Sequence, residues 1–208
     1  MEQKTAELVQ GTDLKDRKLK LTVTPTLVWN GTNPPDITAT IEFSQDNDDT
    51  DPPMPGVVDP TTGKIDISDM PVNDKYTDNI DITIKLDASK MKNADGTKLT
   101  GKARWAEADE GPYQWNGTSG DLGFGWFCQM NASPPPLYNP IPPATIPNMT
   151  LTRKDDTTLE IDDNTPDNSP EYAFCVAFVL EGYNNYYISI DPILTTKNTG
   201  SNSFMLKN

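Results

Sequence analysis

The residues best equipped for chemistry in this sequence form a tetrapeptide, Trp-Asn-Gly-Thr, that occurs twice, beginning at Trp29 and at Trp115. Each copy combines an aromatic ring, which can stack on the face of a sugar, with an amide and a hydroxyl, which can bind its rim. The Asn-Gly step is also common in tight hairpin turns, and a tryptophan before such a turn can simply cover the core. The tetrapeptides therefore predict either a carbohydrate site or two ordinary turns.

The second copy is the better candidate for a sugar site. Trp29 follows an apolar Leu-Val pair and continues a run that is typical of a buried strand. Trp115 instead lies among glycine and proline, in a segment that also supplies amide, phenol and carboxylate groups. We predict a ligand site formed by Trp115, Asn116, Tyr113 and Asp121, with Trp29 and Asn30 as a second set.

Three carboxylates precede this segment, at Glu107, Asp109 and Glu110, between two tryptophans. Two carboxylates that flank a bound sugar are the catalytic equipment of most glycosidases. In a chain this acidic, carboxylates that alternate with alanine are equally typical of a solvated strand edge and turn. A carboxylate-based glycosidase is therefore the third alternative for this sequence, and we predict no catalytic residue.

Two other acidic segments, residues 46–51 and 162–167, carry enough carboxylates to supply oxygen ligands to Ca²⁺. Neither has the spacing of a D-x-D-x-D-G loop, and acidic loops also discourage sheet edges from pairing with one another. We therefore predict no metal site and no cofactor.

The chain has no histidine, which excludes Ser-His-Asp and Cys-His catalysis and most zinc sites. It also lacks the glycine-rich loops that hold nucleotide phosphates. Its two cysteines, Cys128 and Cys175, lie in apolar runs, as expected of buried thiols or of one bridge between two strands. We expect a protein that is not an enzyme.

Charge and hydropathy exclude further classes. Lys and Arg total 17 against 31 Asp and Glu, a net charge of −14, so nucleic acids and anionic membranes would be repelled. No apolar run has the length of a membrane span, and the N-terminal residues have no signal-peptide pattern. These features predict a cytoplasmic location, with neither nucleic acid nor membrane as a partner.

Apolar and polar residues alternate along most of the chain, and this period of two predicts β-strands, most clearly from Ile80 to Leu86. The run from Tyr172 to Leu180 is apolar at both its odd and its even positions, as in a central strand covered on both faces. There are 19 prolines, which leave little room for long helices. We predict an all-β fold with a single domain over residues 1–208, a two-sheet antiparallel β-sandwich, jelly-roll-like, with about ten strands and long Pro-rich loops.

In the C-terminal third, an aromatic-alternating strand from Tyr172 to Gly182 precedes a Tyr186-Tyr187 pair and an Asp191-Pro192 step. Arg104-Trp105 with Glu107 forms a second short motif in the middle of the chain. Together these motifs resemble those of the bacterial inclusion-body protein family of the PixA and AidA type. The resemblance implies a small cytoplasmic all-β bacterial protein without known catalysis, which forms inclusions in some members and binds sugars in relatives, and it assigns no functional residue.

These observations favour a non-enzymatic, lectin-like protein whose partner is carbohydrate. The alternative is a self-assembling inclusion-body or storage protein, whose partner is a second copy of itself. The two hypotheses share the same predicted fold.

Overall fold

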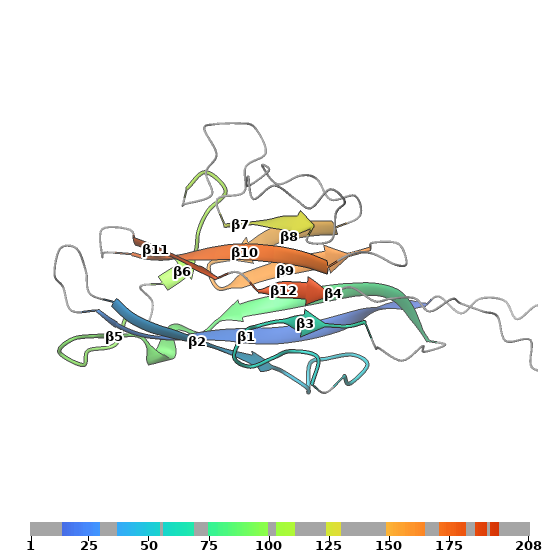
Figure 1. The fold of residues 1–208 in the computed structure, drawn as a ribbon, viewed down its shortest axis with the longest axis horizontal. Coiled ribbons are helices and arrows are strands. Elements are labelled where there is room, and N and C mark those ends of the chain that lie inside the picture. The colour runs from blue at the N-terminus through green and yellow to red at the C-terminus, as the bar shows by residue number, and fades with distance from the viewer. Residues whose placement is uncertain are drawn as a thin grey trace, which may run out of the picture.

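The computed structural model describes residues 14–29, 37–54, 56–68, 75–99, 103–110, 124–129, 149–164, 171–181, 186–190 and 192–195. These residues form twelve strands and one short 3-10 helix (Figure 1). The elements are β1 (Lys15–Trp29), β2 (Ile37–Gln45), β3 (Ile65–Asp66), β4 (Tyr76–Leu86), η1 (Ala88–Lys90), β5 (Lys92–Asn93), β6 (Ala103–Trp105), β7 (Gly125–Gln129), β8 (Met149–Asp155), β9 (Thr158–Asp163), β10 (Glu171–Leu180), β11 (Tyr186–Ile190) and β12 (Ile193–Thr195). The described part of the chain contains no helix with the length and apolar character that a membrane crossing requires.

The first sheet has the strand order β2, β1, β4, β9, β8, with β5 also paired to β1. Its two faces follow from the alternation in the sequence, because successive side chains of a strand point to opposite sides. Leu19 of β1 lies beside Ile82 of β4, which lies beside Ile161 of β9, and all three are buried. Such rows form one wall of the core.

The first sheet is mixed, since β1 and β4 run parallel. β2 reverses the direction of the chain, and the connection from β2 to β4, which passes through β3 of the other sheet, brings the chain back to the same end of β1, where β4 begins. β12 and β3 are also parallel. The prediction of an all-β, two-sheet fold is confirmed, while mixed sheets replace the purely antiparallel, jelly-roll-like arrangement that we expected.

β10 is the central strand of the second sheet. It pairs with β11 and β12 and also with β6 and β7, and β3 joins the sheet through β12. Residues of both parities are buried along it, such as Phe174 and Val176 on one face and Cys175 and Ala177 on the other. The predicted central strand is therefore confirmed.

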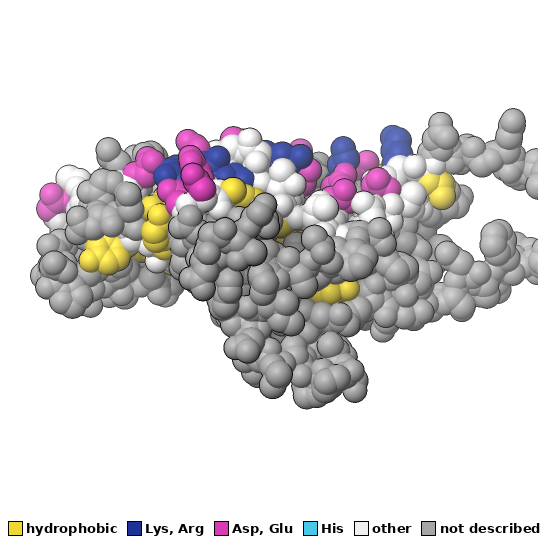
Figure 2. Space-filling view, turned by 90° about the horizontal axis from the view of Figure 1, so that it is seen from above, with side chains coloured by type: hydrophobic (Ala, Val, Ile, Leu, Met, Phe, Trp, Pro, Cys, Tyr) yellow, Lys and Arg dark blue, Asp and Glu magenta, His cyan; other side chains and the backbone are white. Residues whose placement is uncertain are grey.

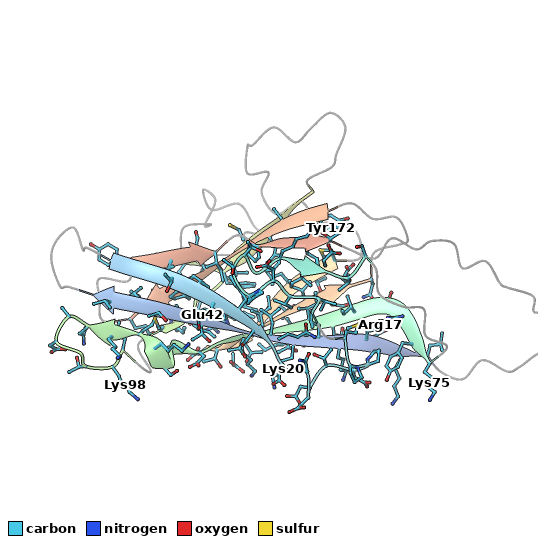
Figure 3. The ribbon with its side chains drawn as sticks, turned by 60° about the horizontal axis from the view of Figure 1, so that its bottom comes forward. Arg17, Lys20, Glu42, Lys75, Lys98 and Tyr172 are labelled. Carbon is cyan, nitrogen blue, oxygen red and sulfur yellow. The ribbon has the colours of Figure 1, made fainter. Side chains whose placement is uncertain are left out.

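The two sheets share one apolar core, whose side chains fill the space between the strands in Figure 3. Trp105, which is fully buried, meets Phe178 edge to face, with ring centroids 6.3 Å apart and planes at 80°. The sheets touch at Gly125 of β7, where an added Cβ would lie 2.7 Å from Cδ2 of Leu151 in β8 and 2.5 Å from the carbonyl oxygen of Cys175. The absence of a side chain at Gly125 permits this close approach.

In the view of Figure 2, the charged side chains of the described residues gather along one side. In the first sheet, Lys18 and Lys20 of β1 project from the face opposite the core, and Asp81 of β4 lies directly beside Lys18 in the register. Glu160 of β9 lies beside Thr83 on the same face. The outer face of the first sheet is therefore a solvated surface of mixed charge.

The two cysteines lie on neighbouring strands but not at opposed positions. Cys128 lies opposite Ala173, and Cys175, which is buried, lies opposite Trp126. Diagonal positions of this kind have Cα atoms about 7–8 Å apart, beyond the reach of an unstrained disulfide. In this register a bridge between them would require the backbone to move.

Candidate functional site

Most of the predicted ligand residues, namely Tyr113, Trp115, Asn116, Asp121 and Asn30, lie outside the described residues. Trp29 is the last residue of β1, and its backbone is aligned with Ile37 and Asn93. The first tetrapeptide therefore begins where a strand ends. Both a carbohydrate-binding loop and an ordinary turn would begin there.

Arg104 in β6 anchors the chain close to where the segment 111–123 begins. Its guanidinium donates to both carboxylate oxygens of Glu110, and its Nε donates to Glu181 at 2.7 Å. Glu110 also accepts a 2.9 Å hydrogen bond from the backbone N–H of Glu107, which closes the turn. One planar arginine fork thus joins the start of this segment to the residue that follows β10.

The ion pair between Arg104 and Glu110 changes the pKa of both side chains. Hydrogen bonds from Arg104 lower the pKa of Glu110 below its ordinary value, against the opposing effect of partial burial. The same hydrogen bonds raise the pKa of Arg104 above its ordinary value. A glycosidase acid must instead hold a proton at neutral pH. The environment of Glu110 therefore favours an ionised carboxylate and does not suit the acid of a glycosidase.

A second arginine, Arg153 in β8, ties the first sheet to the same turn. Its Nε donates to the carbonyl oxygen of Trp105 at 3.2 Å, and one terminal nitrogen donates to Asp156 at 2.6 Å. The backbone N–H of Trp105 donates to the carbonyl oxygen of Asp156 at 2.8 Å. These bonds fix the end of β8 against β6.

The surface beside these contacts contains a hollow of about 400 Å³. Its lining combines apolar and polar side chains from both sheets and from the turn after β6: Glu107, Ala108, Phe124, Leu151, Thr152 and Arg153. Phe124 and Leu151 are largely buried and form an apolar base, whereas a carboxylate, a hydroxyl and a guanidinium lie at the rim. The volume is within the range of small-molecule sites, and the hollow is open to solvent along much of its surface.

Residues that flank both ends of the segment containing Trp115 line this hollow. Glu107 and Ala108 line it just before the chain enters residues 111–123, and Phe124 lines it where the chain returns. The predicted ligand residues are thus attached on both sides to residues that border one hollow.

A second hollow of about 220 Å³ lies on the outer face of the first sheet and is lined mainly by charged groups, among them Lys20, Asp49 and Asp81. Lys20 is already paired with Asp46 at 3.2 Å and with Asp49. Burial, followed by the neighbouring carboxylates of Asp162, Asp16 and Glu160, raises the pKa of Asp81 above its ordinary value. With no apolar ring, this hollow offers a sugar no stacking surface.

The acidic loop 46–51 is held by side chains of the protein. Besides the two ion pairs of Lys20, the hydroxyl of Tyr76 donates to Asp51. Hydrogen bonding to Lys20 lowers the pKa of Asp46. In the ranges that the structure describes, no three His, Cys, Asp or Glu side chains are grouped so that they could hold a metal ion.

The second acidic segment divides its carboxylates between the two faces of a strand. Asp162 and Asp163 are consecutive in β9, so their side chains point to opposite sides of the sheet. Asp163 is buried, and Asp162 is half-buried on the outer face. Two such residues cannot coordinate one ion, and Asp167 lies outside the described residues.

No protein-family model matches the sequence, and a search of curated proteins finds no match. Function must therefore be argued from the residues and their geometry.

Sequence reasoning did not identify several residues of this region as site residues: Arg104, and Ala108, Phe124, Leu151, Thr152 and Arg153 of the hollow. An arginine within a short, otherwise apolar strand is a signal that could have singled out Arg104. Its partner Glu181 is 77 positions away in the chain, and no local pattern pairs residues at that separation.

Proposed function

We propose that this protein is a non-enzymatic β-sandwich that binds carbohydrate at the hollow between β8 and the ends of the segment 111–123. One observation carries the proposal: the segment with the strongest sugar-binding composition starts and ends at residues that line or adjoin a hollow of about 400 Å³. Phe124 and Leu151 supply apolar surface there, and Glu107, Thr152 and Arg153 supply polar groups.

The proposed binding is weak. A sugar that stacks on one ring and forms a few hydrogen bonds must first lose water from its hydroxyls, so little net affinity remains. We expect dissociation constants between about micromolar and millimolar for a single site. The ion pair of Glu110 and the absence of histidine support a binding protein without catalysis.

A glycan array followed by calorimetry tests the proposal. We expect one class of glycan to bind the full chain, and Trp115→Ala to abolish that binding without unfolding the protein. Ala108→Leu, which adds bulk at the rim of the hollow, should weaken binding about tenfold, or about 1.4 kcal/mol. Ala94→Leu makes the same change at an exposed position of the β5 turn and should have no effect. The proposal fails if no glycan binds, or if the two leucine variants bind alike.

A further inference from the structure

We propose that two copies of this chain pair through the outer edge of β8 and continue the first sheet across a twofold axis. This inference does not rest on the carbohydrate proposal and is tested without a ligand, although Leu151 and Thr152 of this edge also line the hollow.

β8 is the last strand of the first sheet. Among the described residues it pairs with β9 and with no other strand. In an antiparallel pair, every second residue directs its N–H and C=O groups away from the neighbouring strand, and such groups form a template for one more strand. The contacts with β6 lie at Arg153 and Asp156. The template therefore extends from Met149 to Thr152.

The opposite edge of the same sheet is protected. The N–H of Phe43 in β2 donates to the carbonyl oxygen of Pro60 at 3.0 Å, so a neighbouring segment covers part of that edge. β2 also carries Glu42, which is exposed and lies 2.7 Å from Lys90. Covering segments and charged side chains are the usual means of keeping an edge from pairing. The stretch from Met149 to Thr152 has neither within the part of the chain that the structure describes.

Charge indicates a second copy as the occupant of this edge. A chain with a net charge of −14 repels its own copies over most of its surface. Met149 to Thr152 are uncharged. Of the charged residues next to them on the outer face, Lys154 and Glu160 form an ion pair across 2.6 Å, and Asp162 lies beside Thr150. This edge is therefore a place where two copies can approach without bringing like charges together.

An antiparallel pairing centred on Leu151 is self-complementary. The twofold axis then places Thr150 of each copy opposite Thr152 of the other, and threonine pairs across strands are favourable. Both threonines are exposed, whereas Leu151 is 7% exposed and would extend the apolar inner row into the second copy.

The same pairing keeps the acidic residues of the two copies apart. Asp162 lies beside Thr150, and Glu160 lies beside Thr152, each on β9. Asp162 of one copy and Glu160 of the other would be separated by three strand spacings, about 14 Å. That distance exceeds the screening length of about 8 Å at physiological ionic strength. The two neutral threonines thus act as a spacer.

Sedimentation equilibrium of the full chain, from micromolar to millimolar concentration, tests the pairing. We expect a reversible monomer–dimer equilibrium. Thr150→Lys combined with Thr152→Lys places two lysines opposite two lysines in the dimer and should weaken it by about tenfold or more, because like charges directly opposite each other destabilise a sheet. Since each added lysine lowers the net negative charge, general electrostatics predicts the contrary change, stronger association.

The control is Thr22→Lys combined with Thr83→Lys, which adds the same charge to the middle of the same face and should leave the dimer intact. A mixture of the double-lysine chain with a Thr150→Glu/Thr152→Glu chain should form a heterodimer, because opposite charges then face each other. A chain that stays monomeric at every concentration would overturn the proposal, as would a dimer that tolerates the edge lysines. Saturable binding of an unrelated extended peptide to a monomeric chain would assign the edge to a different partner and would also overturn it.

Discussion

Gly125→Ala tests how closely the two sheets approach behind the hollow. The new methyl group would lie 2.5 Å from the carbonyl oxygen of Cys175, 2.7 Å from Cδ2 of Leu151 and 3.0 Å from Cγ1 of Val176. Overpacking a core costs about 1–3 kcal/mol, and a clash with a backbone oxygen cannot be relieved by a change of rotamer. We therefore expect a cost near 3 kcal/mol. For a domain of this size, about 2–4 °C is lost per kcal/mol, so the midpoint of thermal unfolding should fall by about 6–12 °C.

Thermal unfolding followed by far-ultraviolet circular dichroism measures this effect. Gly56→Ala is the matched control, because an added Cβ there meets nothing within 4 Å and only the backbone, at φ +79°, is strained. It should cost about 1–2 kcal/mol, the strain of an L-residue in the left-handed region. Adding Leu151→Ala to Gly125→Ala should not restore stability, since the clash with the carbonyl oxygen of Cys175 remains and a cavity is created. A midpoint for Gly125→Ala that equals the wild-type value would refute the sheet contact described above.

Three further predictions concern charge and thiol chemistry. The raised pKa of Asp81 means that the folded protein favours the protonated form of this carboxyl group. The resulting contribution to stability is present below the ordinary pKa of aspartate and is lost as the pH rises through the pKa in the folded state. Asp81→Asn should therefore raise the thermal midpoint at pH 7 and have less effect near pH 4; a lower midpoint at pH 7 would contradict the shift. Arg104→Met should lower the free energy of unfolding by about 1.5–3 kcal/mol in urea, and Arg104→Lys should recover only part of it because lysine cannot form the fork; full recovery by lysine would argue against the bidentate contact. Cys175 should react with thiol reagents only after unfolding, and mass spectrometry should find no bridge to Cys128, whereas rapid native labelling would mean that β10 is not central.

The strands could be predicted where burial imposes a regular pattern. Alternation places β4 correctly around Ile82, and apolar residues at both parities identify β10 as the central strand. β1 is longer than its alternation indicates, because it continues through Pro25 to Trp29. β4 pairs with β1 only as far as Val23 and β5 joins at Val28, so the stretch around Pro25 needs a neighbour on only one side, as proline in a strand requires.

Pairings between distant parts of the chain could not be predicted. The parallel contact of β1 with β4 joins two strands that β2 and β3 separate along the chain, and the contact of Arg104 with Glu181 depends on the register of β10. Both contacts are decided by three-dimensional packing, and neither produces a periodic pattern in the sequence. The candidate site divides in the same way: the composition of the segment around Trp115 is visible in the sequence, whereas the hollow lined by Phe124 and Arg153 exists only in the folded chain.

The most direct test of the proposed site is a nuclear magnetic resonance titration of the ¹⁵N-labelled full chain with the glycan that the array selects. If the sugar occupies the hollow, the amide resonances of Glu107, Ala108, Phe124, Leu151 and Thr152 should shift together with one dissociation constant, while those of the polar hollow around Asp49 should stay unchanged. Shifts confined to the outer face of the first sheet, or no shifts at saturating glycan, would contradict the proposed site.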